Sequence, residues 1–175
     1  MLLEFLDFGW PQAGALLVLV QRGLEEMYSN YNTKRLLAAG GVEKYTGYYR
    51  VVMAAHLSWL LAVLLLMPGD APVLMIPLAI YLGLQIVRYW VIASLGRYWT
   101  HRIVTLEGAP LVHSGPYRYL AHPNYIITIL EIVLLPMIFG GFTLGLVIGT
   151  LYAPILYYKI VLEDRALAPR RSIPG

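Results

Sequence analysis

An apolar run from Ile126 to Ile160 limits the folds open to this chain more than any other feature. As a single helix, the run would be about 52 Å long at ~1.5 Å per residue, whereas the hydrocarbon core of a membrane is ~30 Å thick. The sequence Phe139-Gly140-Gly141-Phe142 provides a natural break, because glycine favours turns. We therefore predict two membrane helices that form a hairpin, with Pro136 as a candidate kink in the first.

The composition supports a membrane protein. Hydrophobic residues make up 59% of the chain and charged residues 13%, against about 45–50% and 25% in soluble domains. The chain has no cysteine, which excludes disulfides, thiolate metal ligands and a cysteine nucleophile. Its four histidines lack the close spacing of a zinc motif, so we predict no metal site. We find no nucleic-acid-binding motif.

Three further apolar segments precede the hairpin. The first begins at Gly9 and reaches the ~20 residues of a membrane span only if it continues through Tyr28; a helix lying in the membrane interface is the alternative. Residues 51–67 form the second segment. The third runs from 71 to about 93, after a turn rich in proline and glycine. We predict an all-α integral membrane protein with about five transmembrane helices and treat residues 29–50 as a polar connection.

The basic residues predict an orientation in the membrane. Residues 29–50, residues 94–122 and residues 161–175 hold ten of the thirteen lysines and arginines. Cytoplasmic segments are enriched in these residues, so all three should face the cytoplasm, and any chemistry should lie on that side of the membrane. We predict one membrane-embedded domain over 1–175, divided into N-terminal helices (1–70), a core (71–167) and a tail (168–175).

Two rows of polar residues occupy one helix face each, at i, i+4, i+7 spacing: Tyr81, Gln85 and Arg88, and Asn124, Thr128 and Glu131. Ionisable groups inside membrane spans are costly, which makes them functional candidates. Glu131 is a candidate to orient a substrate hydroxyl or to act as a base, and Arg88 is a candidate to bind an anionic substrate. The alternatives are a structural interhelical hydrogen bond for Glu131 and an arginine that extends to the interface for Arg88.

Two other features have a structural and a functional interpretation. Lys159 and Glu163 are spaced i, i+4, as in an ordinary helical ion pair, but the hairpin would bring them opposite residues 122–125. His56 is isolated in an apolar segment, which favours a hydrogen-bonded core histidine over a catalytic one.

One segment, from Gly115 to Tyr125, is both polar and rich in aromatic side chains; its sequence is GPYRYLAHPNY. A second polar segment, KIVLEDRAL, follows one hairpin later at 159–167. Together they resemble the isoprenylcysteine carboxyl methyltransferase family, whose pattern is G-x-Y-x-x-x-R-H-P-x-Y, a helical hairpin, then a basic residue and an acidic pair. Residues 95–100 (LGRYWT) resemble the family's L-G-x-x-W-T segment. The resemblance covers about residues 80–167, and the N-terminal part is similar to a bacterial branch that methylates alkylpyrone lipids.

The resemblance implies S-adenosyl-L-methionine (SAM) as cofactor. The family's cofactor contacts carry over to Arg102, Leu111, Val112, Tyr117, His122, Pro123, Asn124, Tyr125 and Glu163. Lys159 stands where the family has a substrate-contacting arginine, which implies a catalytic and substrate-binding role. Two positions depart from the pattern: Ala121 replaces the arginine before His-Pro, and Asp164 is the second member of the acidic pair.

The chemistry of SAM agrees with these residue types. Glu163 is suited to its ammonium group, and His122 at a helix start is suited to its carboxylate. Tyr117 and Tyr125 offer rings for adenine or for the sulfonium. The acceptor would be a lipophilic molecule, with either a carboxylate like that of isoprenylcysteine or the hydroxyl of an alkylpyrone or phenolic lipid. Lys159, Arg102 or Arg88 would hold an acceptor anion.

Three other functions remain open at this stage. An NADPH-dependent membrane reductase of the sterol type needs a basic pocket for the 2′-phosphate, and Ala121 argues against it. A phospholipid N-methyltransferase would use the same cofactor. A non-enzymatic membrane subunit would place its functional polar residues near the middle of the membrane, which suits Glu131 but not the Gly115–Tyr125 segment.

Overall fold

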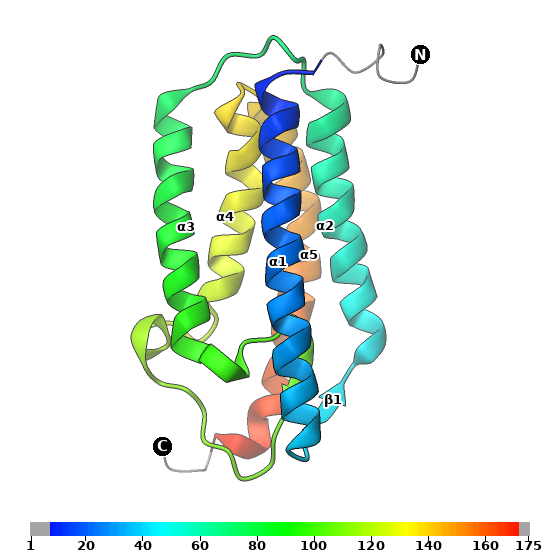
Figure 1. The fold of residues 1–175 in the computed structure, drawn as a ribbon, viewed down its shortest axis with the longest axis vertical. Coiled ribbons are helices and arrows are strands. Elements are labelled where there is room, and N and C mark those ends of the chain that lie inside the picture. The colour runs from blue at the N-terminus through cyan, green and yellow to red at the C-terminus, as the bar shows by residue number, and fades with distance from the viewer. Residues whose placement is uncertain (1–7, 172–175) are drawn as a thin grey trace.

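The computed structural model describes residues 8–171, which form a bundle of five long helices and one two-stranded sheet. Figure 1 shows the helices along the long axis, with residues 96–122 and the end of the last helix gathered at one end of the bundle. The elements are α1 (Trp10–Ala38), β1 (Val42–Lys44), α2 (Thr46–Leu66), α3 (Met75–Leu95), β2 (Ile103–Thr105), α4 (Pro123–Ile138) and α5 (Phe142–Leu167), with 3-10 turns η2 (Gly96–Tyr98), η3 (Gly115–Arg118) and η4 (Ala168–Arg170).

The predicted C-terminal hairpin is confirmed. α4 ends at Ile138 and α5 begins at Phe142, so the break lies where the glycines predicted it. Gly140 has a φ of +76°, a conformation that other residues rarely adopt. A Cβ at Gly145 would lie 2.4 Å from the carbonyl oxygen of Val133, so this glycine lets the two helices approach closely.

The structure has the helix lengths of a nearly all-α membrane protein. Among the described residues, three helices are long and apolar enough to cross a membrane: Thr46–Leu66, Met75–Tyr98 and Phe142–Arg170. α4 is apolar but has 16 residues, and α1 has 29 residues but carries many polar ones. Large apolar side chains on the bundle surface, such as Ile76 and Ile86, are more than 70% exposed, as suits contact with lipid. The count of five spans stays a prediction.

The interpretation of residues 29–50 as a polar connection was wrong for its first ten and its last five residues, because α1 continues to Ala38 and α2 begins at Thr46. At the end of α1, Ser29 and Asn32 are buried on the inner face of the helix, whereas Lys34 and Arg35 are exposed. Asn32 donates hydrogen bonds to the carbonyl oxygens of Gly96 (3.1 Å) and Trp99 (2.9 Å), and the Ser29 hydroxyl accepts one from the His101 amide (2.8 Å). These residues are polar because they hold the irregular segment after α3.

The sheet was not predicted. β1 and β2 pair antiparallel, with Glu43 opposite Val104, and tie the connection after α1 to the segment after η2. Arg102 strengthens this link, since its Nη1 lies 3.3 Å from a carboxylate oxygen of Glu43. Each strand has three residues, too few for an alternating apolar pattern to be visible in the sequence.

A network of buried charges joins α1, α3 and α4 inside the bundle. Arg88 binds Glu25 (Nη2 to Oε2, 2.5 Å) and Glu131 (Nη1 to Oε2, 3.1 Å). Arg22 binds the same two carboxylates at 2.7 and 3.1 Å, and Gln85 donates to the other oxygen of Glu131 at 2.7 Å. Two arginines and two glutamates thus compensate one another where unpaired charges would be very costly.

Replacing Glu131 with alanine should lower the free energy of unfolding by about 3–5 kcal/mol, because Arg22 and Arg88 would then share Glu25 alone in a buried site. The measurement is denaturant unfolding in mixed micelles, with Glu107→Ala on an exposed turn as the control. Equal stability of the two variants would contradict a role for Glu131 in holding the bundle together.

Candidate active site

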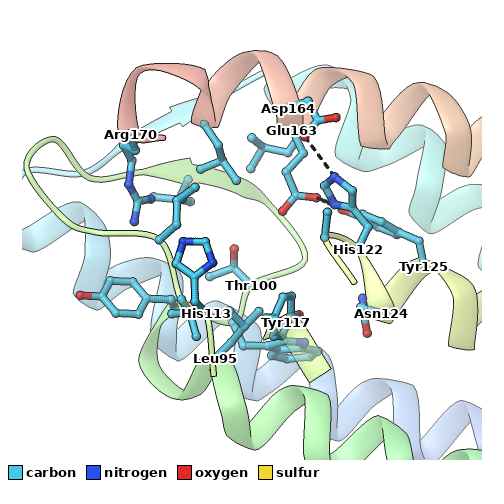
Figure 2. Close-up of a pocket in the computed structure, with 18 of the residues that line it drawn as sticks. Leu95, Thr100, His113, Tyr117, His122, Asn124, Tyr125, Glu163, Asp164 and Arg170 are labelled. Carbon is cyan, nitrogen blue, oxygen red and sulfur yellow. Dashed lines mark hydrogen bonds and ion pairs between the residues drawn. The ribbon is translucent and has the colours of Figure 1, made fainter. Parts of the chain in front are cut away.

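A cavity of about 480 Å³ opens at the end of the bundle where the polar segments gather. Its walls come from the end of α3, residues 98–104, residues 111–113, the start of α4 and the end of α5 (Figure 2). Eight of the nine residues predicted to bind a cofactor line it: Arg102, Leu111, Val112, Tyr117, His122, Asn124, Tyr125 and Glu163. The ninth, Pro123, is buried in the first turn of α4, where the sequence predicted a helix-starting proline.

The two ends of the hairpin meet at one wall of this cavity. The Tyr125 hydroxyl donates a hydrogen bond of 2.5 Å to Glu163, and His122 lies 3.0 Å from Asp164 through Nε2 and 3.7 Å from Glu163 through Nδ1. Figure 2 shows His122 and Tyr125 facing Glu163 and Asp164. The acidic pair is therefore fixed by α4, and the Glu163 side chain is 29% exposed toward the cavity.

Two buried polar atoms of the cavity residues have no hydrogen-bond partner within residues 8–171. They are Oδ1 of Asn124 and Nε of Arg102. The rest of the Arg102 guanidinium contacts Glu43 and lies over the Tyr49 ring, 4.5 Å from its centroid. Buried polar atoms are rarely left unpaired, so a free acceptor and a free donor here indicate a site built for a polar ligand.

Burial also affects Tyr117, another residue of the cavity wall. Removal from water raises the pKa of its hydroxyl, and the nearby Glu163 carboxylate raises that pKa further. Tyr117 is therefore neutral at physiological pH and presents an uncharged ring to the cavity.

Arg170 fixes the loop that carries Leu111 and Val112. Its Nε donates to the carbonyl of Ala109 at 2.7 Å and its Nη2 to the carbonyl of Pro110 at 2.9 Å. The sequence prediction placed this arginine in a tail at 168–175; instead, residues 168–170 form η4 and Arg170 is buried, while 172–175 lie outside the described residues. The motif spacing gave no signal for this contact.

A smaller cavity of about 60 Å³ lies deeper between the helices and shares Asn124 and Tyr125 with the large one. Lys159, which the resemblance assigned to the substrate, lines this cavity. Its ammonium donates to the carbonyl of His101 (3.0 Å) and lies over the Tyr125 ring, instead of pairing with Glu163. The cavity is lined by Arg22, Glu26, Tyr49, Val52, Met53, His56, Arg88, His101, Asn124, Tyr125, Thr128, Leu156 and Lys159.

The two intramembrane charges that the sequence singled out, Arg88 and Glu131, pair with each other but differ in their relation to the cavities. Arg88 lines the small cavity through the edge of the buried network, whereas Glu131 lines neither cavity and both of its oxygens accept hydrogen bonds. The partners Arg22 and Glu25 were missed, although their i, i+3 spacing on an apolar helix was a signal. His56 contacts the Tyr152 hydroxyl and the Val52 carbonyl, as a core histidine does. Within residues 8–171, no cluster of side chains suits a metal ion.

Comparison with known proteins covers both the site and the N-terminal helices. A family model described as the isoprenylcysteine carboxyl methyltransferase (ICMT) family matches residues 75–169. The chain is 33% identical over 155 residues to "Uncharacterized protein YpbQ" of Bacillus subtilis (strain 168). The aligned region covers 86% of this chain and 92% of that protein. No solved structure matches the chain at a significant level. The family match includes the start of α4, the hairpin and the acidic pair, and the chain belongs to the isoprenylcysteine carboxyl methyltransferase family.

Proposed function

We propose that this membrane methyltransferase uses SAM to methylate a lipophilic acceptor at the cytoplasmic face of a bacterial plasma membrane. The acceptor carries either a carboxylate, as in isoprenylcysteine, or the hydroxyl of an alkylpyrone or phenolic lipid. The observation that carries the proposal is the convergence of eight residues, matched to the family's cofactor contacts, around one cavity at the end of the hairpin.

The residues of the large cavity fit SAM group by group. Glu163 and Asp164 offer carboxylates to the ammonium group as charge-assisted partners. His122, which precedes the first turn of α4, and the amides of that turn suit the carboxylate of the cofactor. The rings of Tyr117 and Tyr125 suit adenine or the sulfonium. The volume of about 480 Å³ is within the ~300–1,000 Å³ of small-molecule sites.

When bound, SAM supplies a methyl group activated by positively charged sulfur. The protein's task is alignment, which by itself contributes several orders of magnitude in rate. Asn124 and Tyr125 line both cavities, so we assign the meeting point of donor and acceptor to these two residues. Lys159 beside Tyr125 supplies positive charge on the acceptor side.

The small cavity suits the reactive end of the acceptor. Val52, Met53 and Leu156 give it an apolar wall and Lys159 gives it positive charge, whereas the charge of Arg88 is balanced by Glu25 and Glu131. A lipid tail would reach it laterally between helices, leaving the polar end near Tyr125. In this proposal Glu131 supports the bundle, because its carboxylate is held by Arg22, Arg88 and Gln85 and lies outside both cavities.

Purified protein in detergent should bind S-adenosylhomocysteine with a micromolar dissociation constant, measured by calorimetry with NADPH titrated in parallel. Glu163→Gln should weaken this binding at least tenfold, about 1.4 kcal/mol or more, because the neutral amide loses a charge-assisted bond. Asp70→Asn, in the connection at the opposite end of the bundle, is the control and should bind normally.

NADPH binding without S-adenosylhomocysteine binding would favour a reductase of the sterol type. Binding of neither ligand by folded protein would favour a non-enzymatic membrane subunit. Normal binding of S-adenosylhomocysteine by Glu163→Gln would show that the cofactor site is assigned wrongly. A screen of phospholipid amines with labelled SAM tests the N-methyltransferase alternative.

Arg170→Met should weaken S-adenosylhomocysteine binding about tenfold, while the groups proposed to bind the ligand stay the same. The variant loses both hydrogen bonds to the 109–110 carbonyls, so the loop that carries Leu111 and Val112 must be ordered when the ligand binds. Arg165→Met, an exposed arginine at the same end of α5, is the matched control. Equal affinity of the two variants would mean that the loop contributes nothing to the cofactor site.

A further inference from the structure

A histidine–carboxylate pair borders the small cavity and has no role in the function proposed above. His101 Nδ1 lies 2.8 Å from Oε2 of Glu26. The other oxygen of Glu26 accepts hydrogen bonds from the Tyr49 hydroxyl (2.6 Å) and from the Asn30 amide (2.8 Å). With both oxygens engaged, the carboxylate of Glu26 is fixed in orientation and in turn fixes the imidazole ring.

The backbone of His101 is held as firmly as its ring. Its amide donates to the Ser29 hydroxyl at 2.8 Å, and its carbonyl accepts from the Lys159 ammonium at 3.0 Å. The ring packs edge-on against Trp99, 4.7 Å between centroids, and Trp99 is 2% exposed. Contacts with α1, with α5 and with the buried ring of Trp99 therefore leave His101 little freedom.

This arrangement fixes the tautomer of His101. In the neutral ring, Nδ1 must carry the proton to donate to Glu26, which leaves a lone pair on Nε2. Within residues 8–171, Nε2 has no hydrogen-bond partner, and His101 lines the small cavity together with Lys159 and Tyr125. The free nitrogen is thus available to a ligand in that cavity.

Burial, with the charges around it, keeps His101 neutral. Burial lowers its pKa, and the positive charges of Lys159 on α5 and Arg88 on α3 lower it further, whereas Glu26 on α1 opposes them. Tyr49 on α2 and Tyr125 on α4 face the same cavity, as does Arg22 on α1. A neutral histidine with a free Nε2 can accept a proton at physiological pH.

We propose that His101 is a catalytic residue, the general base that removes a proton from a hydroxyl group of the acceptor, and that Glu26 is its positioning residue. The inference rests on the methyl transfer proposed above and names the acceptor class as a weakly acidic hydroxyl, phenol or enol. A carboxylate acceptor has already lost its proton near pH 7 and would not need a base.

The proton and electron balance of this step is complete. The acceptor oxygen forms a bond to the methyl carbon while its proton passes to Nε2 of His101. The carbon–sulfur bond breaks with its electron pair going to sulfur, whose positive charge is lost. The positive charge then lies on the imidazolium, which Glu26 stabilises, and the proton is returned to solvent. Lys159, whose ammonium lies 3.0 Å from the carbonyl oxygen of His101, would stabilise negative charge on the acceptor oxygen as it develops.

The pairing of the arginines supports the same acceptor class. A carboxylate is best recognised by a free guanidinium that makes two parallel hydrogen bonds. Both arginines of the small cavity, Arg22 and Arg88, are already bound to glutamates of the buried network. The cavity therefore offers one proton acceptor and one lysine, a combination that suits a hydroxyl better than a carboxylate.

The test compares two acceptors with the same alkyl chain, a phenol with a pKa near 10 and a nitrophenol that is ionised at the assay pH. His101→Gln should slow methylation of the phenol by about 10²-fold or more and leave the nitrophenol nearly unchanged, because that acceptor needs no base. Wild-type protein should methylate the phenol faster than a fatty carboxylate of equal length. Equal slowing of both phenols, slowing of neither, or a preference for the carboxylate would overturn the proposal.

A spectroscopic measurement tests the same idea without turnover. In ¹⁵N-histidine-labelled wild-type protein, the signal that His101→Gln removes should report a neutral ring with its proton on Nδ1. Glu26→Gln should shift this ring toward the other tautomer, whereas Glu107→Gln should not. A wild-type ring protonated on Nε2 would overturn the proposal. S-adenosylhomocysteine should bind the wild type and His101→Gln with equal affinity. If S-adenosylhomocysteine does not bind the wild type, the function proposed above is contradicted instead.

Discussion

Charge burial inside an apolar bundle is the constraint on which the rest of the structure depends. Arg88 and Glu131 are each at most 2% exposed, in a region where an unpaired charge would be very costly. Each is tolerated because α1 brings a complementary charge, Glu25 or Arg22. This pairing requires one particular register of α1 against α3 and α4. In that register, Ser29 and Asn32, one and two turns after Glu25, reach the backbone of residues 96–101.

The position of the large cavity follows from the length of the hairpin. α4 runs for 16 residues before the turn, so at equal rise per residue the partner of its first turn lies about 16 residues into α5. That level is close to Lys159, and Glu163 lies one turn beyond, opposite His122 and Tyr125. Two short motifs far apart in sequence therefore form one wall, and the apolar residues between them serve mainly to set their spacing.

These relations explain which parts of the molecule could be predicted from the sequence. The hairpin and its turn were predictable because a glycine break marks them, and eight residues that line the large cavity were predicted from the family resemblance. The extension of α1 was misjudged because polar residues on a buried helix face resemble a loop in composition; the spacing of Glu25, Ser29 and Asn32 at i, i+4, i+7 was the signal. Arg170 and His101 act from irregular segments, where no periodicity indicates which atoms they contact.

The two cavities also divide along the boundary of the family match. The residues lining the large cavity fall between 95 and 171, and the family model matches 75–169. The small cavity takes six of its thirteen lining residues, among them Glu26, Tyr49 and His56, from α1 and α2, outside that match. In our proposal, a donor site built on the hairpin can thus be kept while other N-terminal helices shape the acceptor side. In this chain, adjacent residues of α1 bind two different groups: Glu25 pairs with Arg88 and Glu26 with His101. One register of α1 therefore positions both carboxylates, which in our proposal links the packing of the helix to the chemistry of the acceptor.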